Sequence, residues 1–263
     1  MTLQLLWEHP AAGRGELPGS LLDLYDGALG FARPTVYANF VETLDGIVSI
    51  PDLERSNAVV ADESEDDRLV MGILRALADA VFIGTGTLLA SPKGRWRPEG
   101  VYPPGKEAFA ELRTMLGKPE RAAVAIVTTG RSLDVSHPVV RDGALVLTTP
   151  DGAARLDGSG AELVVLGDGD QVDLRMAVDA LRARGYRDIL CEAGPTTFGE
   201  LLADGLVDEL FLTLSPVLAG RLPARPRLSL VEGVELAPAA RIAPELVSLR
   251  RGGSHVFARY AFS

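Results

Sequence analysis

The feature that most constrains the fold of this sequence is an alternation, from about residue 35 onward, of short apolar runs with amphipathic helical segments. The runs predicted as strands are Thr35–Val41, Ala80–Ile83, Ala122–Val127, Ala144–Thr148, Glu162–Leu166, Asp188–Cys191 and Glu209–Leu214. The segments predicted as helices are Ser64–Ala78, Lys106–Leu116, Asp173–Arg184 and Thr196–Ala203. Because strands and helices of these lengths alternate, the sequence predicts an α/β domain built on a mainly parallel sheet.

The two ends of the chain depart from this alternation. The first 30 residues mix proline, glycine and short apolar pieces, so we expect residues 1–30 to form an arm packed on a single domain of residues 31–263. The tail from Leu236 to Phe262 alternates polar and apolar residues, and Gly252-Gly253 separates its two halves. That pattern predicts a C-terminal antiparallel hairpin.

The charge balance and the single cysteine exclude several classes of function. The 263 residues include 26 Lys and Arg against 36 Asp and Glu, and this net charge of −10 argues against nucleic acid or an anionic membrane as a partner. Cys191 alone cannot form an intramolecular disulfide or a multi-cysteine zinc site, and His9, His137 and His255 lack metal-ligand spacing, so we expect no metal. We find neither a membrane-length apolar run nor a signal peptide, and therefore expect a cytoplasmic protein.

Two glycine-containing turns follow predicted strands, where parallel sheets bind their ligands. The first turn is Ile83–Thr87, in which Gly84 and Gly86 would let a phosphate approach the backbone and Thr87 could donate a hydrogen bond to it. The sequence of this turn is neither GxGxxG nor a P-loop. A tight turn without a ligand is therefore an equally good interpretation.

The second turn lies at the end of the strand that contains Cys191. In Gly194–Thr197, a proline suits the first turn of a helix, and two threonine hydroxyls flank the unpaired N–H groups of that turn. This arrangement favours the binding of an anion. Glu192 precedes it, and we expect its carboxylate to accept hydrogen bonds from a ligand, the alternative being that it caps the helix.

Further candidates are one turn and a set of arginines. Asn39–Gly46 reads NFVETLDG and contains Asp45-Gly46, a dipeptide that is more commonly a plain turn. The arginines that could bind phosphate, although each alone is more commonly a surface group, are Arg68, Arg75, Arg95, Arg97 and Arg131. Arg75 differs from the others because it lies within an apolar helical stretch. No nucleophile motif accompanies these groups, which suits a cofactor that brings its own chemistry, such as a nicotinamide.

Three blocks of the sequence resemble one known family, in the right order and at fitting intervals. Cys191–Gly220 is similar to a signature of the form E-(G/A)-G-P-T…G-L-V-D-E-L…P-x-L-x-G, Leu74–Ala90 resembles L-R-A-x-x-D-A-x-x-x-G-x-x-T, and Thr43–Gly46 resembles S-L-D-G. The chain thus resembles, over about residues 35–263, the C-terminal reductase domain of the bacterial bifunctional riboflavin-biosynthesis deaminase/reductase. The resemblance implies a three-layer, dihydrofolate-reductase-like fold.

The resemblance also implies roles for individual residues. Those expected to contact NADPH are Val41, Gly84, Gly86, Thr87, Ser91, Thr128, Thr129, Arg131, Gly194, Pro195, Thr196, Thr197, Phe198, Gly199 and Glu200. Within this set, the segment from Gly194 to Glu200 would hold the pyrophosphate, and Thr128 and Thr129 would lie beside the adenosine 2′-phosphate. Those expected to bind the substrate are Asn39, Asn57, Arg75, Arg95, Arg97 and Glu192, with Arg95 or Arg97 on its phosphate.

The sequence departs from the family in two respects. Ser91 stands where the family commonly has an aspartate assigned to the catalytic centre, so proton transfer would need Asp45, Glu192 or water, or the substrate would differ. The H-x-E…P-C-x-x-C pattern of a zinc deaminase is missing, and we therefore expect a stand-alone reductase.

We expect an NADPH-dependent reductase of a phosphoribosylamino-pyrimidine in riboflavin biosynthesis, of the 5-amino-6-(5-phosphoribosylamino)uracil reductase type, with hydride transfer to C1′ of the ring-opened ribosyl imine. Two alternatives stay open: reduction of dihydrofolate or another pterin-like heterocycle, and a nucleotide-binding module without catalysis. Since related reductases form dimers, the resemblance also implies a homodimer.

Overall fold

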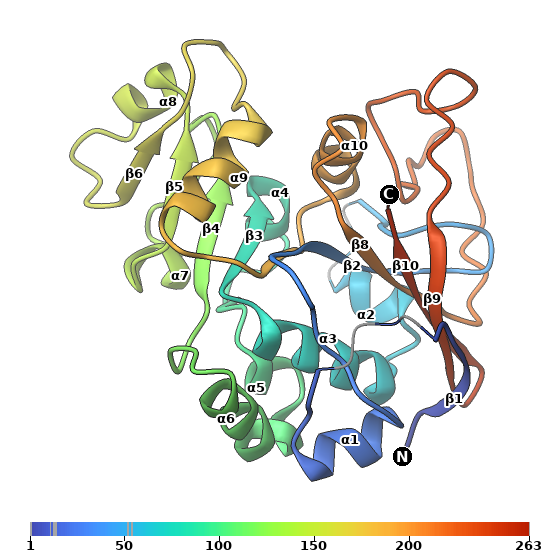
Figure 1. The fold of residues 1–263 in the computed structure, drawn as a ribbon. Helices are drawn as coiled ribbons and strands as arrows, with labels where there is room; N and C mark the ends of the chain where they lie inside the picture. Colours follow the sequence, from blue (N-terminus) through green and yellow to red (C-terminus); the bar gives the residue numbers. More distant parts are fainter. Residues whose placement is uncertain (1, 11, 13–14, 52, 54, 263) are drawn as a thin grey trace.

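A computed structural model describes residues 2–10, 12, 15–51, 53 and 55–262. Its strands form one sheet in the order β1-β9-β10-β8-β2-β7-β3-β4-β5-β6 (Figure 1). The strands are β1 (Gln4–Glu8), β2 (Val36–Glu42), β3 (Ala80–Gly84), β4 (Ala123–Val127), β5 (Leu145–Thr148), β6 (Glu162–Val165), β7 (Ile189–Cys191), β8 (Glu209–Leu214), β9 (Glu245–Gly252) and β10 (His255–Ala261). From β8 to β6 in this order all neighbours are parallel, whereas β10, β9 and β1 continue the sheet in antiparallel pairs.

Helices cover both faces of this sheet. They are α1 (Gly19–Tyr25), α2 (Ser56–Val60), α3 (Glu65–Leu77), α4 (Thr85–Leu89), α5 (Pro98–Val101), α6 (Lys106–Met115), α7 (Pro138–Arg141), α8 (Pro150–Arg155), α9 (Leu174–Ala183) and α10 (Pro195–Ala203), with a 3₁₀ turn η1 (Pro103–Gly105). Along β3, Val81 and Ile83 pack with the buried residues of α1, α3 and α6, whereas Phe82 packs with those of α9 and α10. The predicted three-layer α/β fold with a mainly parallel sheet is therefore confirmed.

Helix α3 illustrates how local chemistry fixes the ends of an element. Ser64 is its N-cap, and the Ser64 hydroxyl accepts a hydrogen bond from the backbone N–H of Asp67 at 3.2 Å. At the other end, the buried guanidinium of Arg113 donates hydrogen bonds to the carbonyls of Ala76 and Ala78, at 2.9 and 2.8 Å. These bonds satisfy carbonyls that a helix C-terminus leaves without partners.

The predicted strands and helices are present with ends shifted by at most one residue, and the C-terminal hairpin is confirmed. Its first strand begins at Glu245 rather than at Leu236, and the turn runs through Gly253, which has a φ of +57°. The first 30 residues contribute β1, which pairs with β9, and α1, which buries Leu21 and Tyr25. None of the described helices is long and apolar enough to cross a membrane.

Candidate active site

The central strands β2, β7 and β3 end at the same edge of the sheet. Strand β7 lies between the other two; on one side β2 leads to β8, and on the other side β3 leads to β4. A parallel sheet binds ligands at such a reversal of strand order, beyond the carboxyl ends of its strands. Here α4 follows β3 and α10 follows β7, so both glycine turns lie at this edge (Figure 1).

The two glycine turns are neighbours in space. Gly84 and Gly194 are the N-caps of α4 and α10, and neither helix has a side-chain cap. A Cβ atom added to Gly84 would lie 3.7 Å from the Thr197 hydroxyl, and the Thr87 hydroxyl donates a hydrogen bond to the Glu192 carbonyl at 3.2 Å. A Cβ atom on Gly194 would meet no atom within 4 Å. The turns thus border open space with uncapped N–H groups around it.

Within 194–200, few side chains are free to contact a ligand. Phe198 is fully buried and packs on Phe40 with ring centroids 4.8 Å apart. Gly199 faces the segment 231–234, where an added Cβ would lie 2.6 Å from the Glu232 carbonyl oxygen. Pro195 is also buried, whereas Thr196 and Glu200 are exposed. A ligand at this turn would therefore meet mainly backbone N–H groups and threonine hydroxyls.

Arg75 and Glu192 form a buried ion pair at the same edge. The Arg75 guanidinium donates two hydrogen bonds to the Glu192 carboxylate, at 2.9 and 2.6 Å, and the two side chains are 11% and 9% exposed. Arg75 also donates a 3.5 Å bond to the Arg97 carbonyl. Helix α3, the end of strand β7 and the loop before α5 are thereby joined through one guanidinium, so Arg75 is not a surface group.

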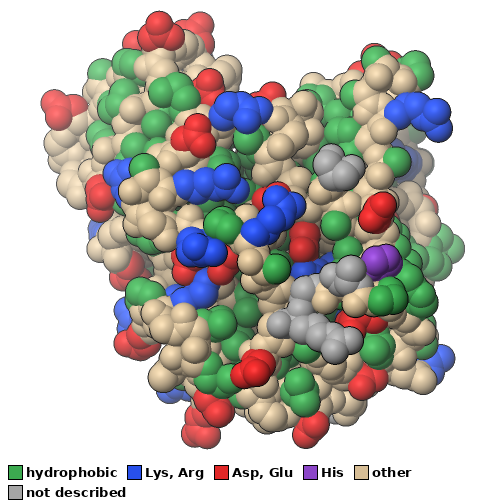
Figure 2. Space-filling model, in the orientation of Figure 1, with side chains coloured by type: hydrophobic (Ala, Val, Ile, Leu, Met, Phe, Trp, Pro, Cys, Tyr) green, Lys and Arg blue, Asp and Glu red, His purple; other side chains and the backbone are tan. Residues whose placement is uncertain are grey.

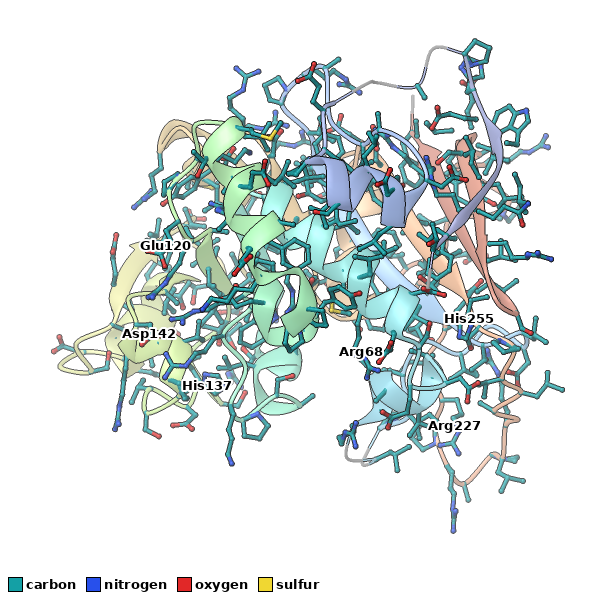
Figure 3. All side chains as sticks on the ribbon, turned by 90° about the horizontal axis from the view of Figure 1, so that it is seen from below. Arg68, Glu120, His137, Asp142, Arg227 and His255 are labelled. Atoms are coloured by element: carbon teal, nitrogen blue, oxygen red, sulfur yellow. The ribbon has the colours of Figure 1, made fainter. Side chains whose placement is uncertain are left out.

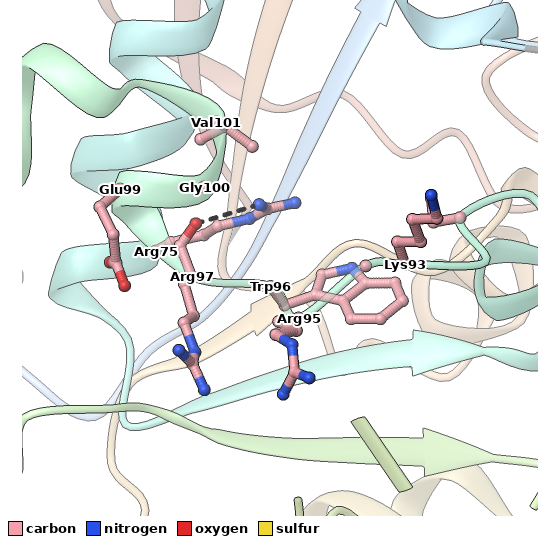
Figure 4. A pocket seen from close by; sticks show the side chains of 10 residues that line it. Arg75, Lys93, Arg95, Trp96, Arg97, Glu99, Gly100 and Val101 are labelled. Atoms are coloured by element: carbon pink, nitrogen blue, oxygen red, sulfur yellow. Dashed lines mark hydrogen bonds between the residues drawn. The ribbon is translucent and has the colours of Figure 1, made fainter. Parts of the chain in front are cut away.

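A cavity of about 440 Å³ opens beside this pair (Figure 4). Its lining includes four of the residues singled out in the sequence, Arg75, Ser91, Arg95 and Arg97. It also includes residues that the sequence analysis missed: Lys93, Gly94, Trp96, Glu99, Gly100 and Val101. The lining carries four cationic side chains and one carboxylate, and Figure 2 shows Lys and Arg side chains gathered near the middle of one face. Three of the four cations are ion-paired with Glu192 or Asp142, so the cations exceed the carboxylates by one when these two partners are counted. The cavity therefore suits an anionic ligand.

The loop that lines the cavity is held from behind by His137. The His137 Nδ1 atom accepts a hydrogen bond from the Val139 N–H at 3.2 Å, so its Nε2 carries the proton and donates to the Ser91 carbonyl at 2.9 Å. The His137 ring also lies 6.1 Å from the ring of Trp96, which is buried and has a φ of +49°. His137 therefore has a structural role here, at the N-terminus of α7.

Asp45 is placed as a link between two loops. Its carboxylate accepts hydrogen bonds from the Thr43 hydroxyl at 2.5 Å and from the N–H groups of Ala219 and Gly220 at 3.0 and 2.7 Å. The Thr43 hydroxyl bond, followed by the backbone bonds, lowers the pKa of Asp45 to about 2. A carboxyl group with this pKa is ionised at neutral pH and is a poor proton donor.

The predicted residues at the end of β4 lie beside the end of β5 rather than at the cavity. Thr128 is buried, and its hydroxyl accepts a hydrogen bond from the Gly130 N–H at 3.0 Å. Gly130 and Gly152 approach so closely that a Cβ on Gly130 would lie 2.8 Å from the Gly152 carbonyl oxygen. Arg155 donates a 3.1 Å bond to the Thr129 carbonyl, and Arg131 is exposed.

Three predicted residues lie on strand β2 and helix α2 and do not line the cavity. Asn39 is half-buried in β2, and Val41 is buried against Val60 and Ala61 at the end of α2. Asn57 is exposed on α2. The Val41 side chain contributes to packing, so only its backbone is available to a ligand.

A metal site and a reactive cysteine are two other kinds of chemistry that a site at this edge could use. No group of three or more His, Cys, Asp or Glu side chains that could hold a metal occurs among the residues that the structure describes. Cys191 is fully buried, and burial raises the pKa of its thiol to about 12, so it stays protonated. The arrangement instead combines a lined cavity, a buried guanidinium and two uncapped helix turns.

The chain is similar to known proteins over most of its length. The chain is 27% identical over 196 residues to a protein of Archaeoglobus fulgidus named 2,5-diamino-6-ribosylamino-4(3H)-pyrimidinone 5′-phosphate reductase, covering 72% of this chain and 83% of that protein. It is 29% identical over 214 residues to a protein of the same name from Methanothermobacter thermautotrophicus, covering 80% and 90%.

The fold has solved counterparts as well. A crystal structure of a pyrimidine reductase-like protein from Corynebacterium diphtheriae superposes with a TM-score of 0.69 at 22% identity, covering 95% of this chain and 96% of that one. The model of the RibD C-terminal domain matches residues 34–256. The chain therefore belongs to the RibD C-terminal domain family.

Proposed function

We propose that this protein reduces 2,5-diamino-6-ribosylamino-4(3H)-pyrimidinone 5′-phosphate with NADPH. The observation that carries the proposal is the cavity lined by Arg75, Arg95 and Arg97, which opens beside two uncapped glycine turns. Both curated relatives described above are named reductases of this substrate. The cavity would take the phosphorylated pyrimidine, and the turns would take the dinucleotide.

The dinucleotide fits the open space between the turns. Uncapped N–H groups at Gly194–Thr197 and the hydroxyl groups of Thr196 and Thr197 are suited to a pyrophosphate. Arg131 and Arg155, beside the end of β4, would favour the 2′-phosphate that distinguishes NADPH from NADH. When bound, the reduced nicotinamide supplies a hydride, which the ring-opened ribosylamine would take up at C1′.

The phosphate end of the substrate fits the electropositive side of the cavity. Arg95 and Arg97 extend in the same direction from the lining loop (Figure 4), and two guanidinium groups side by side suit a phosphoryl group. Arg75 is held by Glu192 and by the Arg97 carbonyl, so its position is fixed before a ligand arrives. Such preorganisation aligns donor and acceptor.

The carboxylates of Asp45 and Glu192 are arranged to position other groups rather than to donate protons. Asp45 is ionised and bound to its own loops, and the Glu192 carboxylate is hydrogen-bonded to Arg75. We therefore assign Glu192 the role of orienting Arg75 and do not retain Asp45 as a proton donor. Ser91 lines the cavity at the position where the family commonly has an aspartate, so no carboxyl group stands there and solvent water is the proton source in this proposal.

The proposal is tested by mixing the purified protein with NADPH and the pyrimidinone phosphate and following the absorbance of the reduced cofactor. We expect oxidation that depends on the substrate and is faster with NADPH than with NADH. The deaminated aminouracil analogue and dihydrofolate serve as competing substrates in parallel assays. Oxidation with dihydrofolate alone, or tight NADPH binding without turnover of any of them, would contradict the proposal and favour one of the two alternatives.

Two further expectations accompany this function. A homodimer would elute from gel filtration at about twice the mass of the 27.9 kDa chain. Fractionation of the producing cells would place the protein in the cytoplasm.

A further inference from the structure

Arg95 and Arg97 do not face the cavity unpaired. Both guanidinium groups reach the same carboxylate oxygen of Asp142: Arg95 forms an ion pair with it, and Arg97 donates to it at 3.5 Å. Asp142 lies at the end of α7, 45 residues or more along the chain, in the segment between β4 and β5 that also carries His137 (Figure 3). The carboxylate thus occupies the donors that a phosphoryl group would need.

We propose that Asp142 competes with the substrate's phosphoryl group for Arg95 and Arg97 and holds these two arginines when no phosphoryl group is bound. The inference deepens the proposed function and rests on it for the identity of the phosphorylated substrate. A phosphoryl group brings two negative charges at neutral pH and three acceptor oxygens, so it displaces a single carboxylate from the two arginines. A substrate that carries a hydroxyl group in the same place cannot displace it, and the arginines stay with Asp142.

The exposure of the three side chains makes this exchange feasible. Arg95, Arg97 and Asp142 are 43%, 27% and 38% exposed, so water screens their attraction and the contact is weak. The Arg75–Glu192 pair behind them is buried and has two good hydrogen bonds. A ligand can therefore replace Asp142 at the two arginines, whereas the Arg75–Glu192 pair stays intact.

The backbone at Asp142 is held in place independently of the arginines. Its N–H donates to the carbonyls of Pro138 and Val140 at the end of α7. At the start of the same helix, His137 is bonded to Ser91 on the lining loop. Replacing the carboxylate by an amide would thus leave the helix and the loop attached to each other.

The test compares the wild-type protein with Asp142→Asn. Inorganic phosphate is titrated into each protein and followed by ³¹P NMR, and KM is measured for the pyrimidinone phosphate and for its dephosphorylated form. We expect phosphate to bind about two- to five-fold more tightly to D142N, in keeping with the strength of an exposed ion pair. The KM for the phosphorylated substrate falls by a similar factor, and the KM for the dephosphorylated form does not change.

Two controls separate this mechanism from a general effect of charge. Asp157→Asn removes the same charge at an exposed position and should leave phosphate binding unchanged. In an Arg95→Ala/Arg97→Ala background, the gain from D142N should disappear, because it acts through these two arginines.

The inference is overturned if D142N binds phosphate no better than wild type, if D157N improves binding equally, or if phosphate binds none of these proteins. If the wild-type protein fails to oxidise NADPH with the pyrimidinone, the proposed function is wrong. The phosphate titrations still decide the role of Asp142 in that case.

Discussion

The buried pair of Arg75 and Glu192 joins helix α3 to the end of strand β7 through two hydrogen bonds. Breaking a buried ion pair leaves one charge without a partner, which destabilises a protein by about 3 kcal/mol. Replacing both members by uncharged residues removes that penalty, because no charge stays buried. The pair therefore allows stability and activity to be separated.

We predict that Glu192→Gln lowers the free energy of unfolding by about 3 kcal/mol and also raises the KM for the pyrimidinone. In Arg75→Met/Glu192→Gln the stability should recover largely, whereas the activity should stay low, since no guanidinium remains at the cavity. Denaturant unfolding and steady-state kinetics measure the two quantities. Recovery of activity together with stability would show that the pair has only a structural role.

Asp67 is a second residue whose environment has a measurable consequence. It is buried on α3, and burial, only partly offset by a hydrogen bond from Thr213 and by the charge of His255, raises its pKa to about 6. The folded state therefore holds this proton more tightly than the unfolded chain, in which the pKa is near 3.8. The resulting stability is fully present below pH 3.8 and is lost as the pH rises through 6.

We predict that Asp67→Asn removes this dependence. Relative to the wild-type protein, D67N should gain stability between pH 4 and pH 7, by at most about 3 kcal/mol. Thermal unfolding of both proteins across this pH range measures the difference, with Asp204→Asn as an exposed control. A constant difference at every pH would mean that Asp67 does not titrate in this range.

At the scale of elements, α10 packs into the core along its length and borders open space at its N-terminus. Two of its glycines face different surroundings: a Cβ on Gly199 would press on Glu232 and Val234, at 2.6 and 3.0 Å, whereas a Cβ on Gly194 would project into open space. The φ of Gly194 is −66°, which alanine adopts without strain. Alanine at position 199 should therefore affect stability, whereas alanine at position 194 should affect ligand binding.

We predict that Gly199→Ala destabilises the protein by about 1–3 kcal/mol because the loop 231–234 must move. Gly194→Ala should leave stability within about 1 kcal/mol of wild type and weaken NADPH binding by about tenfold, since the methyl group fills the space that the pyrophosphate would use. Calorimetric titration with NADPH and thermal unfolding of both variants test this pair. Undiminished NADPH binding by G194A would place the cofactor elsewhere.

The burial and the length of an element decide whether its sequence pattern predicts it. Strands such as β3 are buried on both faces and so read as continuous apolar runs, and α9 carries a regular apolar stripe. Helices α2 and α7 have five and four residues, too few for a periodic pattern. Strand β1 exposes Leu6 and Trp7, so its hydrophobicity gives no alternation to detect.

The site could be predicted in part for similar reasons. Gly84 and Gly194 follow buried strands, and Arg75 interrupts an apolar helix, so each has a local signal. The contact of Arg97 with Asp142 joins residues 45 apart, and no local pattern reports such a pairing. The left-handed backbone of Trp96 likewise has no sequence signal, because tryptophan rarely adopts it.

For the molecule as a whole, Arg250 joins the two ends of the chain. Its guanidinium lies 3.9 Å from the Tyr25 ring centroid and donates to the Tyr25 carbonyl at 2.9 Å and to the Glu8 carboxylate at 3.2 Å. It also bonds the Ser248 hydroxyl at 2.9 Å. The first 30 residues and the C-terminal hairpin therefore share one buried cation, and β1 extends the sheet beyond β9.

We predict that Arg250→Met releases this end of the sheet, because the carbonyls of Tyr25 and Asp26 and the carboxylate of Glu8 lose a donor. The free energy of unfolding should fall by about 3 kcal/mol, and the amides of β1 and α1 should exchange with solvent faster than those of β3. Arg251→Ala, an exposed change on the same strand, should alter stability by less than about 1 kcal/mol. Hydrogen exchange measured element by element decides between local and global loosening: equal acceleration in β1 and β3 would mean that the two ends unfold only together with the core.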